Sequence, residues 1–411
     1  MKKIITIMFH SVGLDCHNWP YPHISENYFS FYKKMRAIAQ AKYKMLSFED
    51  ASKIYCLKKS VCLTFDDGYL DNWSFIFPLL KKYNLKATIF VNPDFVDPRD
   101  IVRPQYNPDL LNYKNYCSLQ QYIGFLSWSE MKLMEQSNLV DIQSHGMTHT
   151  WYFSGPEIVD FWHPGSATEH DGPVWMLWNK FPEKKPFYLM NALNYERKIP
   201  YGTPIYEHRK SLESKKFEPN EPELEAMILR YVQDHGREVF FKTEGWRIVL
   251  TDIVKMYRKR LGGRTLGHFE TDNDYKSRVI YELVASKEII EHNLNKTVDA
   301  ICWPGGGVSE EVLRIAKKVG YKYFTLPGSW KTRHISNCCE NMISRITSVP
   351  RVLWKGNFIC YVTGAQFLSI IESARGSFFA RSKGKTIKFI QLLKYFFSRI
   401  LGDNSIAIKK N

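Results

Sequence analysis

The sequence predicts an α/β fold in which parallel strands alternate with helices. Short apolar runs rich in β-branched residues recur along the chain, and segments with helical spacing separate them. Several of the apolar runs also end in polar residues. In parallel sheets and barrels the chemistry lies at the carboxyl ends of the strands. The polar residues that follow the predicted strands therefore form the candidate site.

The first part of the chain contains a regular succession of strands and helices. Buried strands are predicted at 4–9, 61–65, 87–91 and 140–143, with helices at 25–40, 75–83 and 128–135. The first run follows two lysines and superficially resembles a signal peptide. It is too short for one, and no small-residue cleavage site follows it. We therefore expect it to be the first strand.

The succession is interrupted after His149. Residues 151–205 are rich in Trp, Tyr, Phe, Pro and Gly without a sustained period, and charged helices are expected at 221–235 and 246–261. The strand and helix alternation resumes with predicted elements at 274–295, 300–303, 310–319 and 321–325. We therefore predict one domain from residues 1–150 and 275–355, and an insertion at 151–274 that is a possible substrate-binding cap.

Composition sets limits on the class of protein. Of the 411 residues, 44% are hydrophobic and 24% are charged, which is typical of a globular protein. No apolar stretch approaches the length of a membrane-spanning helix. The eight cysteines form no CxxC pair and no framework spacing. Reduced thiols in the cytoplasm are therefore expected.

The positive charge is concentrated in a tail at 376–411. The chain carries a formal charge of +15, and this tail has eight Lys or Arg residues but a single acid, Asp403. Phe389, Leu393, Phe396 and Ile400 share one face of a predicted basic amphipathic helix. Such a helix suits an anionic membrane surface, here the inner face of the cytoplasmic membrane, or it docks on the domain or on glycan-assembly proteins. No nucleic-acid partner is expected, because no recognisable binding motif accompanies the charge.

Two carboxylates and two imidazoles are the candidate catalytic groups. Asp66 and Asp67 follow the strand at 61–65, and because adjacent carboxylates repel, a divalent metal ion beside them is expected. An acidic turn is the simpler explanation of this feature alone. His145 and His149 are four residues apart and can face one ion, although a buried or capping pair is an equally good explanation. Together they offer one Asp and two His to a metal site open to water, while the other Asp can act as a base.

Two of these segments resemble the first motifs of the polysaccharide deacetylase family, also known as the NodB-homology or carbohydrate esterase 4 family. The segments are TFDDG at 64–68 and SHGMTH at 144–149. The resemblance implies a distorted (β/α)7-type barrel and an enzyme that removes N-acetyl groups from amino sugars. It also implies that Asp66 is the general base and that Asp67, His145 and His149 hold one divalent metal ion. Zinc suits these ligands first, and iron, nickel or cobalt would also fit.

A third segment, CWPGG at 302–306, resembles the family's loop that holds the acetyl group and the oxyanion. By this resemblance Trp303, Pro304, Gly305 and Gly306 bind substrate. The arginine that often precedes this loop, and orients the base, has no evident equivalent, because Ile301 stands near that place. An orienting arginine is therefore not expected.

The family's catalytic histidine, normally near the C-terminus, is matched here by His10 after the first strand. This order resembles the circularly permuted branch that acts on poly-N-acetylglucosamine-type exopolysaccharides. The resemblance implies that His10 is the general acid, and a structural hydrogen bond at a strand end is the alternative. The resemblance covers roughly residues 1–150 and 275–350, where 322–327 and Ser344-Arg345-Ile346 resemble the last barrel segments of that branch. Outside it, aromatic residues follow the histidine motif and either extend a sugar-binding groove or form a small core of the insertion: Trp151, Tyr152, Phe161, Trp162, Trp175 and Trp178.

These observations predict a metal-dependent hydrolase that removes N-acetyl groups from an amino sugar of a bacterial surface polysaccharide or its precursor. The same chemistry permits an O-deacetylase or a deformylase of a glycan. The missing arginine and the large insertion also allow a catalytically silent glycan-binding scaffold. An N-acetylated glycan is the expected partner in the first case.

Overall fold

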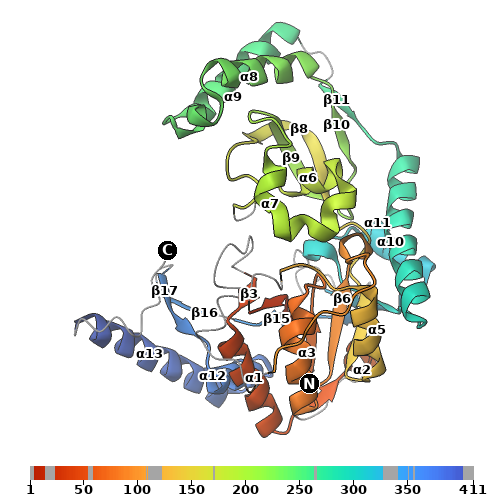
Figure 1. Ribbon diagram of the computed structural model, residues 1–411, viewed down its shortest axis with the longest axis vertical. Coiled ribbons are helices and arrows are strands. Elements are labelled where there is room, and N and C mark those ends of the chain that lie inside the picture. Colours follow the sequence, from red (N-terminus) through yellow and green to blue (C-terminus); the bar gives the residue numbers. More distant parts are fainter. Residues whose placement is uncertain are drawn as a thin grey trace.

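The structure is a computed structural model. It describes residues 4–13, 24–53, 59–107, 109, 123–169, 172–262, 266–326, 341–349, 351–354 and 357–400. Figure 1 shows two parts stacked along the longest axis, a sheet surrounded by helices below and a smaller group of strands and helices above.

The lower part is a parallel sheet that closes on itself. Its strands, in order of pairing, are β14 (Met342–Ile343), β13 (Tyr323–Thr325), β12 (Ala300–Ile301), β7 (Val140–Ser144), β6 (Ala87–Val91), β5 (Ser60–Phe65), β1 (Ile5–Phe9) and β15 (Arg345–Thr347). Every pairing is parallel. The first and last strands of this order are separated in sequence by Ser344 alone, so one segment pairs with β13 at its start and with β1 at its end. The barrel thus has seven strand positions, which confirms the predicted (β/α)7-type fold.

Helices cover the outside of the barrel. They are α1 (Tyr28–Gln40), α2 (Phe48–Lys53), α3 (Phe77–Tyr83), α5 (Trp128–Gln136), α10 (Asp272–Leu294), α11 (Glu310–Val319) and α12 (Gly364–Ala374). A further strand, β4 (Lys44–Leu46), pairs with β5 beside the main path. All six residues of β5 are buried, as expected for a strand covered on both faces. Ile7, Leu63, Ile89, Ile142 and Ile301 are among the fully buried core residues.

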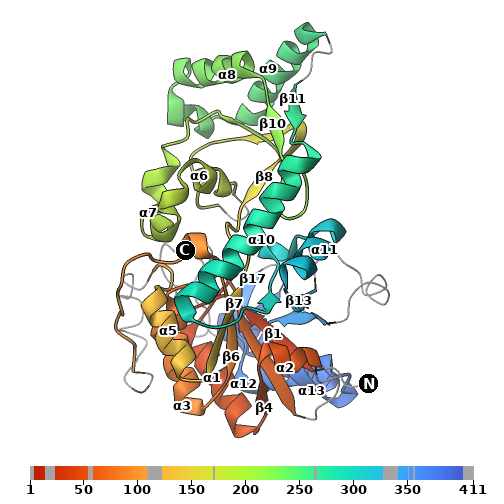
Figure 2. The same cartoon turned by 90° about the vertical axis from the view of Figure 1, so that its right-hand side faces the viewer.

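The upper part is formed by residues between β7 and α10. It contains the antiparallel pair β8 (Trp151–Phe161) and β9 (Pro204–Lys210), the pair β10 (Phe217–Pro219) and β11 (Gly267–Phe269), and helices α6 (Trp175–Lys180), α7 (Tyr188–Glu196), α8 (Pro222–Asp234) and α9 (Trp246–Leu261). Figure 2 shows α10 running from this part down along the barrel. The prediction of irregular structure is wrong at β8, which is an eleven-residue strand. We retain the division into barrel, insertion and tail as a proposal.

The chain ends with the hairpin β16 (Arg351–Trp354) and β17 (Asn357–Tyr361), helix α12, and helix α13 (Phe378–Ile400). A short parallel pair, β2 (Ser11–Val12) and β3 (Ser25–Glu26), lies near the end of β1. Within the described part of the chain, every helix is too short or too polar to span a bilayer.

Candidate active site

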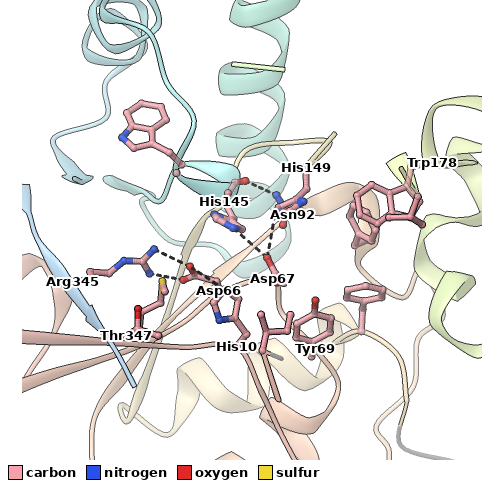
Figure 3. A pocket seen from close by; sticks show the side chains of 18 of the residues that line it. His10, Asp66, Asp67, Tyr69, Asn92, His145, His149, Trp178, Arg345 and Thr347 are labelled. Carbon is pink, nitrogen blue, oxygen red and sulfur yellow. Dashed lines mark hydrogen bonds and ion pairs between the residues drawn. The ribbon is translucent and has the colours of Figure 1, made fainter. Parts of the chain in front are cut away.

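The candidate residues come from the carboxyl ends of neighbouring barrel strands. His10 follows β1, the pair Asp66 and Asp67 follows β5, and His145 follows β7. The register aligns Phe9 with Phe65, so His10 and Asp66 leave the sheet at the same level. Figure 3 shows these side chains converging, although they are far apart in the sequence.

A tight backbone turn points the two adjacent carboxylates in different directions. Asp67 has φ +73° and Gly68 has φ +67°, both in the left-handed region. A Cβ atom at Gly68 would lie 2.9 Å from Cγ1 of Val91, so the turn also requires the absence of a side chain there. Asp67 faces His145 and His149, whereas Asp66 faces Arg345 (Figure 3).

Asp67, His145 and His149 form one cluster of possible metal ligands. Oδ1 of Asp67 lies 3.2 Å from Nε2 of His145 and 3.4 Å from Nε2 of His149. The three ligand atoms all lie within 4.8 Å of one another. The three side chains that the sequence assigned to the metal are therefore within reach of one ion.

The donor chemistry of this cluster fits a cation. Nδ1 of His145 lies 2.8 Å from the backbone oxygen of Cys302, and because a carbonyl can only accept, this nitrogen carries the proton. In neutral His145, Nε2 then presents a lone pair to a carboxylate oxygen, and two acceptors repel unless a positive charge lies between them. Oδ1 of Asp67 is also buried without a hydrogen-bond donor among the described residues. The three side chains are thus suited to hold a divalent metal ion.

The pKa values of the cluster indicate which groups are charged when no metal ion is bound. Burial would raise the pKa of Asp67, but chiefly its contact with His145 holds this pKa well below its usual range. Burial lowers the pKa of His149 to about 4, so this imidazole is neutral at pH 7, the form that binds metals. Burial opposes protonation of His145, but Cys302 and Asp67 raise its pKa well above the usual value. Without an ion, His145 is therefore protonated and its Nε2 proton faces Asp67. A divalent cation held by this cluster would take the place of that proton.

A second group of possible ligands, Asp66, His145 and Cys302, lies next to the first. Both carboxylate oxygens of Asp66 already accept hydrogen bonds from Arg345, and Nδ1 of His145 donates to the Cys302 carbonyl. The first cluster is therefore the better site for an ion.

Arg345 corrects the expectation that no arginine orients the base. Its Nη1 lies 2.6 Å from Oδ1 of Asp66 and its Nη2 lies 2.8 Å from Oδ2, a bidentate pair. Burial would raise the pKa of Asp66, but the charge of Arg345, followed by that of His145, holds it below its usual value. Arg345 begins β15, the strand that closes the barrel, rather than preceding the loop after β12. Asp66 is thus kept ionised, as a general base must be.

His10 and Cys302 complete the surroundings of Asp66. Nε2 of His10 lies 3.9 Å from Oδ2 of Asp66, and its side chain is 22% exposed, so it can reach a molecule in the pocket. The Cys302 thiol donates to Oδ2 of Asp66 at 3.5 Å and lies 2.9 Å from Nη2 of Arg345. The thiol thus extends the network that fixes the carboxylate.

Buried polar groups hold the loop that carries both histidines. Glu282 of α10 accepts hydrogen bonds from the backbone N–H groups of Met147 and Thr148, at 3.1 and 3.0 Å, and from the Thr148 hydroxyl. Asn92 donates to the backbone oxygens of His145 and Gly146. These contacts explain how the loop keeps its shape, including the left-handed φ of +45° at His149.

The insertion also contributes to this loop. Nζ of Lys185, a buried side chain next to α7, lies 2.7 Å from Oδ2 of Asp94 and 3.1 Å from the backbone oxygen of Thr148. The Thr150 hydroxyl donates a hydrogen bond to Oδ1 of Asn179, near the end of α6. The segment between β7 and α10 therefore supports the histidine loop directly.

We expect Glu282→Ala to weaken metal binding by about 10–100-fold. Glu282 holds the loop that orients both histidines, and groups that orient metal ligands contribute to the affinity for the metal. Titration of the metal-free protein with Zn²⁺ against a chromophoric chelator measures this. Glu288→Ala, at an exposed position of the same helix, is the matched control. An unchanged affinity in Glu282→Ala would show that the loop does not depend on this carboxylate.

The site opens into a pocket of about 700 Å³. Its lining includes His10, both aspartates, both histidines, Arg345, Trp303, Gly305 and Gly306. Pro304 is not among the lining residues and instead approaches Gly146, where a Cβ atom would lie 3.2 Å from its Cγ. Three of the four residues predicted in this loop therefore face the pocket.

Trp151 is also absent from the lining, and Nζ of Lys210 lies 5.3 Å from the centre of its ring. The insertion reaches the pocket through Val174, Trp178, Tyr188 and Leu189 instead. Trp178 is one of the aromatic residues expected in a groove or in a core, and its 6.2 Å T-shaped contact with His149 places it beside the ligand cluster. Other aromatic side chains such as Trp162 are buried in a core that the insertion forms together with Tyr69, Phe95 and Phe125. Both alternatives for the aromatic segment thus occur, at different residues.

The sequence matches the profile of the family described as Polysaccharide deacetylase at residues 56–168 and 217–324, more than half of the chain. A curated relative, the "Putative polysaccharide deacetylase YxkH" of Bacillus subtilis (strain 168), is 59% identical over 34 residues, which are 8% of this chain and 12% of that protein. The match thus spans only a small part of that relative's length.

Solved structures resemble the chain at low identity. A de-N-acetylase from Aggregatibacter actinomycetemcomitans has a TM-score of 0.47 at 16% identity, over 84% of this chain and 94% of that one. The BpsB deacetylase domain from Bordetella bronchiseptica has a TM-score of 0.45 at 16% identity, over 84% and 95%. IcaB from Ammonifex degensii has a TM-score of 0.42 at 13% identity, over 91% and 98%. On the match of the family profile, the chain belongs to the polysaccharide deacetylase family.

Proposed function

We propose that this protein is a metal-dependent hydrolase that removes N-acetyl groups from an amino sugar of a bacterial surface polysaccharide or its precursor. One observation carries the proposal. An ionised carboxylate, Asp66, lies in the same pocket as the Asp67, His145 and His149 cluster, with His10 beside it. A base, a possible metal site and an acid are thus available to one bound acetamide.

A divalent cation held by Asp67, His145 and His149 would polarise the acetyl carbonyl and lower the pKa of a water molecule. Asp66 accepts a proton from the attacking water, whose oxygen forms a bond to the carbonyl carbon. The carbon–nitrogen bond then breaks, and His10 donates a proton to the departing nitrogen. The products are acetate and the free amino sugar.

We assign the N–H of Gly305 to the developing oxyanion. In this loop the N–H of Trp303 donates to Oγ1 of Thr325 at 3.2 Å, and the N–H of Gly306 donates to the Trp303 carbonyl. Pro304 has no N–H to offer. Gly305 lines the pocket and adopts φ +54°, a conformation that favours glycine.

Two imidazoles and one carboxylate suit zinc, although iron, nickel or cobalt would fit the same ligands. We expect removal of the metal with a chelator to lower acetate release from N-acetylated glucosamine oligomers by at least about a hundredfold. Adding Zn²⁺ back should restore the activity. Acetate is measured enzymatically, and the metal content of the purified protein is measured in parallel.

Matched oligomers that carry O-acetyl groups distinguish the alternatives. Release from the O-acetylated oligomers alone would favour the O-deacetylase. A metal-free protein that binds the glycan but releases no acetate would favour the scaffold. Arg345 removes one reason for the scaffold, since the base has its orienting arginine.

The proposal includes an N-acetylated glycan as partner and the insertion as a cap over the pocket. Trp178 and Tyr188 support the cap, because aromatic faces pack on sugar rings and both residues line the pocket. It also includes a cytoplasmic location at the inner face of the membrane, which depends on helix α13.

A further inference from the structure

Helix α13 packs on the barrel with one face only. Five of its partly buried residues recur every three or four positions, as expected for one face of a helix: Ala380, Gly384, Ile387, Gln391 and Tyr395. Leu392, also partly buried, lies beside this face. This face meets α12. Nε2 of Gln391 lies 3.2 Å from Oε1 of Gln366, and a Cβ atom at Gly384 would lie 3.6 Å from Cβ of Ser369. The helix thus packs on the barrel, one of the three positions that the sequence left open for it.

The opposite face is apolar and exposed. Seven large apolar side chains are between 39% and 87% exposed, and at about 100° per residue they fall within an arc of about 120°: Phe378, Phe379, Phe389, Ile390, Leu393, Phe396 and Phe397. We refer to these seven residues as the outward stripe. On the same face, Ser382 and Thr386 separate Phe378 and Phe379 from the other five. A cluster of exposed apolar side chains such as the one from Phe389 to Phe397 marks an interaction site.

Basic side chains border the outward stripe on both sides. On the helical wheel, Lys383 and Lys394 lie beyond one edge, and Arg381, Lys385 and Lys388 lie beyond the other. All five are exposed. No Asp or Glu occurs from residue 376 to residue 400. The charge around the outward stripe is therefore entirely positive and complementary to an anionic surface.

We propose that α13 binds the surface of an anionic lipid bilayer, lying in the plane of the membrane with the outward stripe among the acyl chains. Long basic side chains at the borders of an apolar face can extend to the headgroups while their methylene groups remain in contact with the apolar layer. The described part of α13 is too polar to cross the bilayer, so it lies on the surface.

The position of α13 allows membrane binding and catalysis together. In Figures 1 and 2 the helix lies along the lower part of the molecule, at the opposite end from α8 and α9. Among the side chains of α13 that the structure describes, none lines the candidate pocket. A membrane under α13 would therefore hold the enzyme at the surface without blocking the pocket.

The test is co-sedimentation of the full chain with two kinds of vesicle. One contains phosphatidylcholine alone, and the other contains about 30% of the anionic lipid phosphatidylglycerol. We expect binding to the anionic vesicles only, and weaker binding as salt rises. Phe389→Ser with Phe397→Ser should weaken binding at least about tenfold, because each phenylalanine loses the gain from burial. Lys385→Ala with Lys388→Ala should weaken it about 25-fold at low salt.

Matched controls come from other exposed helices. Ile248→Ser on α9 and Lys132→Ala on α5 should bind the vesicles as the unmodified chain does. Circular dichroism checks that each variant is folded, so the test does not depend on catalytic activity. No binding to anionic vesicles, or equal binding by the α13 variants, would overturn the proposal. Self-association that depends on the outward stripe, without vesicle binding, would assign the stripe to a protein contact instead and also overturn it.

Discussion

Asp66→Asn should lower kcat for acetate release by about 10²–10⁴-fold and leave metal binding intact. The amide has nearly the same shape as the carboxylate but cannot take a proton from water. Metal binding should persist because the carboxylate of Asp66 is directed to Arg345, whereas Oδ1 of Asp67 faces the two imidazoles. Metal content and acetate release are measured on the same preparation.

Asp67→Asn is the matched contrast, one residue along the same turn. It removes a charged ligand, so both metal content and activity should fall. The two adjacent variants thus separate the base from the ligand. If Asp66→Asn retained its turnover, or if it lost its metal while Asp67→Asn kept it, the two roles would be wrongly assigned.

The candidate cluster could be predicted because each of its residues is marked by the sequence immediately around it. Each of Asp66, Asp67, His145 and His10 directly follows a strand whose apolar run is readable in the sequence, and parallel strands bring their carboxyl ends to one rim. The barrel was predictable for the same reason. Its strands are buried on both faces, so they appear as short continuous apolar runs.

Arg345 could not be placed in this way. It is 279 positions from Asp66, and it reaches the carboxylate only because the last strand closes the barrel beside β1. The one available signal was Ser344-Arg345-Ile346 in the final barrel segment. When two residues meet only because the last strand of a barrel pairs with the first, no periodicity or spacing in the sequence links them.

The insertion was hidden for another reason. β8 pairs with β9 through register shifts between Phe153 and Ile158 and between Ile158 and Asp160, so its side chains do not alternate as in a regular strand. Trp178 lines the pocket from α6, which belongs to the segment between β7 and α10 and not to the barrel. Such positions depend on how the insertion packs, which composition alone does not determine.

Arg345→Met should lower kcat/KM at pH 7 by about 10²–10³-fold and shift the acid limb of its pH profile upward. In the unmodified protein Arg345 opposes the effect of burial and keeps the pKa of Asp66 low. Without the guanidinium, burial acts unopposed and the pKa rises. Because the base must be deprotonated, activity is then lost at a higher pH as the solution is acidified.

The same variant should lower the free energy of unfolding by about 3–5 kcal/mol at pH 7, since it leaves a buried carboxylate without its partner. This deficit should shrink at lower pH, because protonation of Asp66 removes the buried charge. Arg345→Lys is the conservative control. It keeps the positive charge but loses the bidentate geometry. The acid limb of its pH profile should therefore lie close to that of the unmodified protein, while its kcat/KM is only partly restored. An acid limb that stays in place in Arg345→Met would mean that Arg345 has a structural role alone.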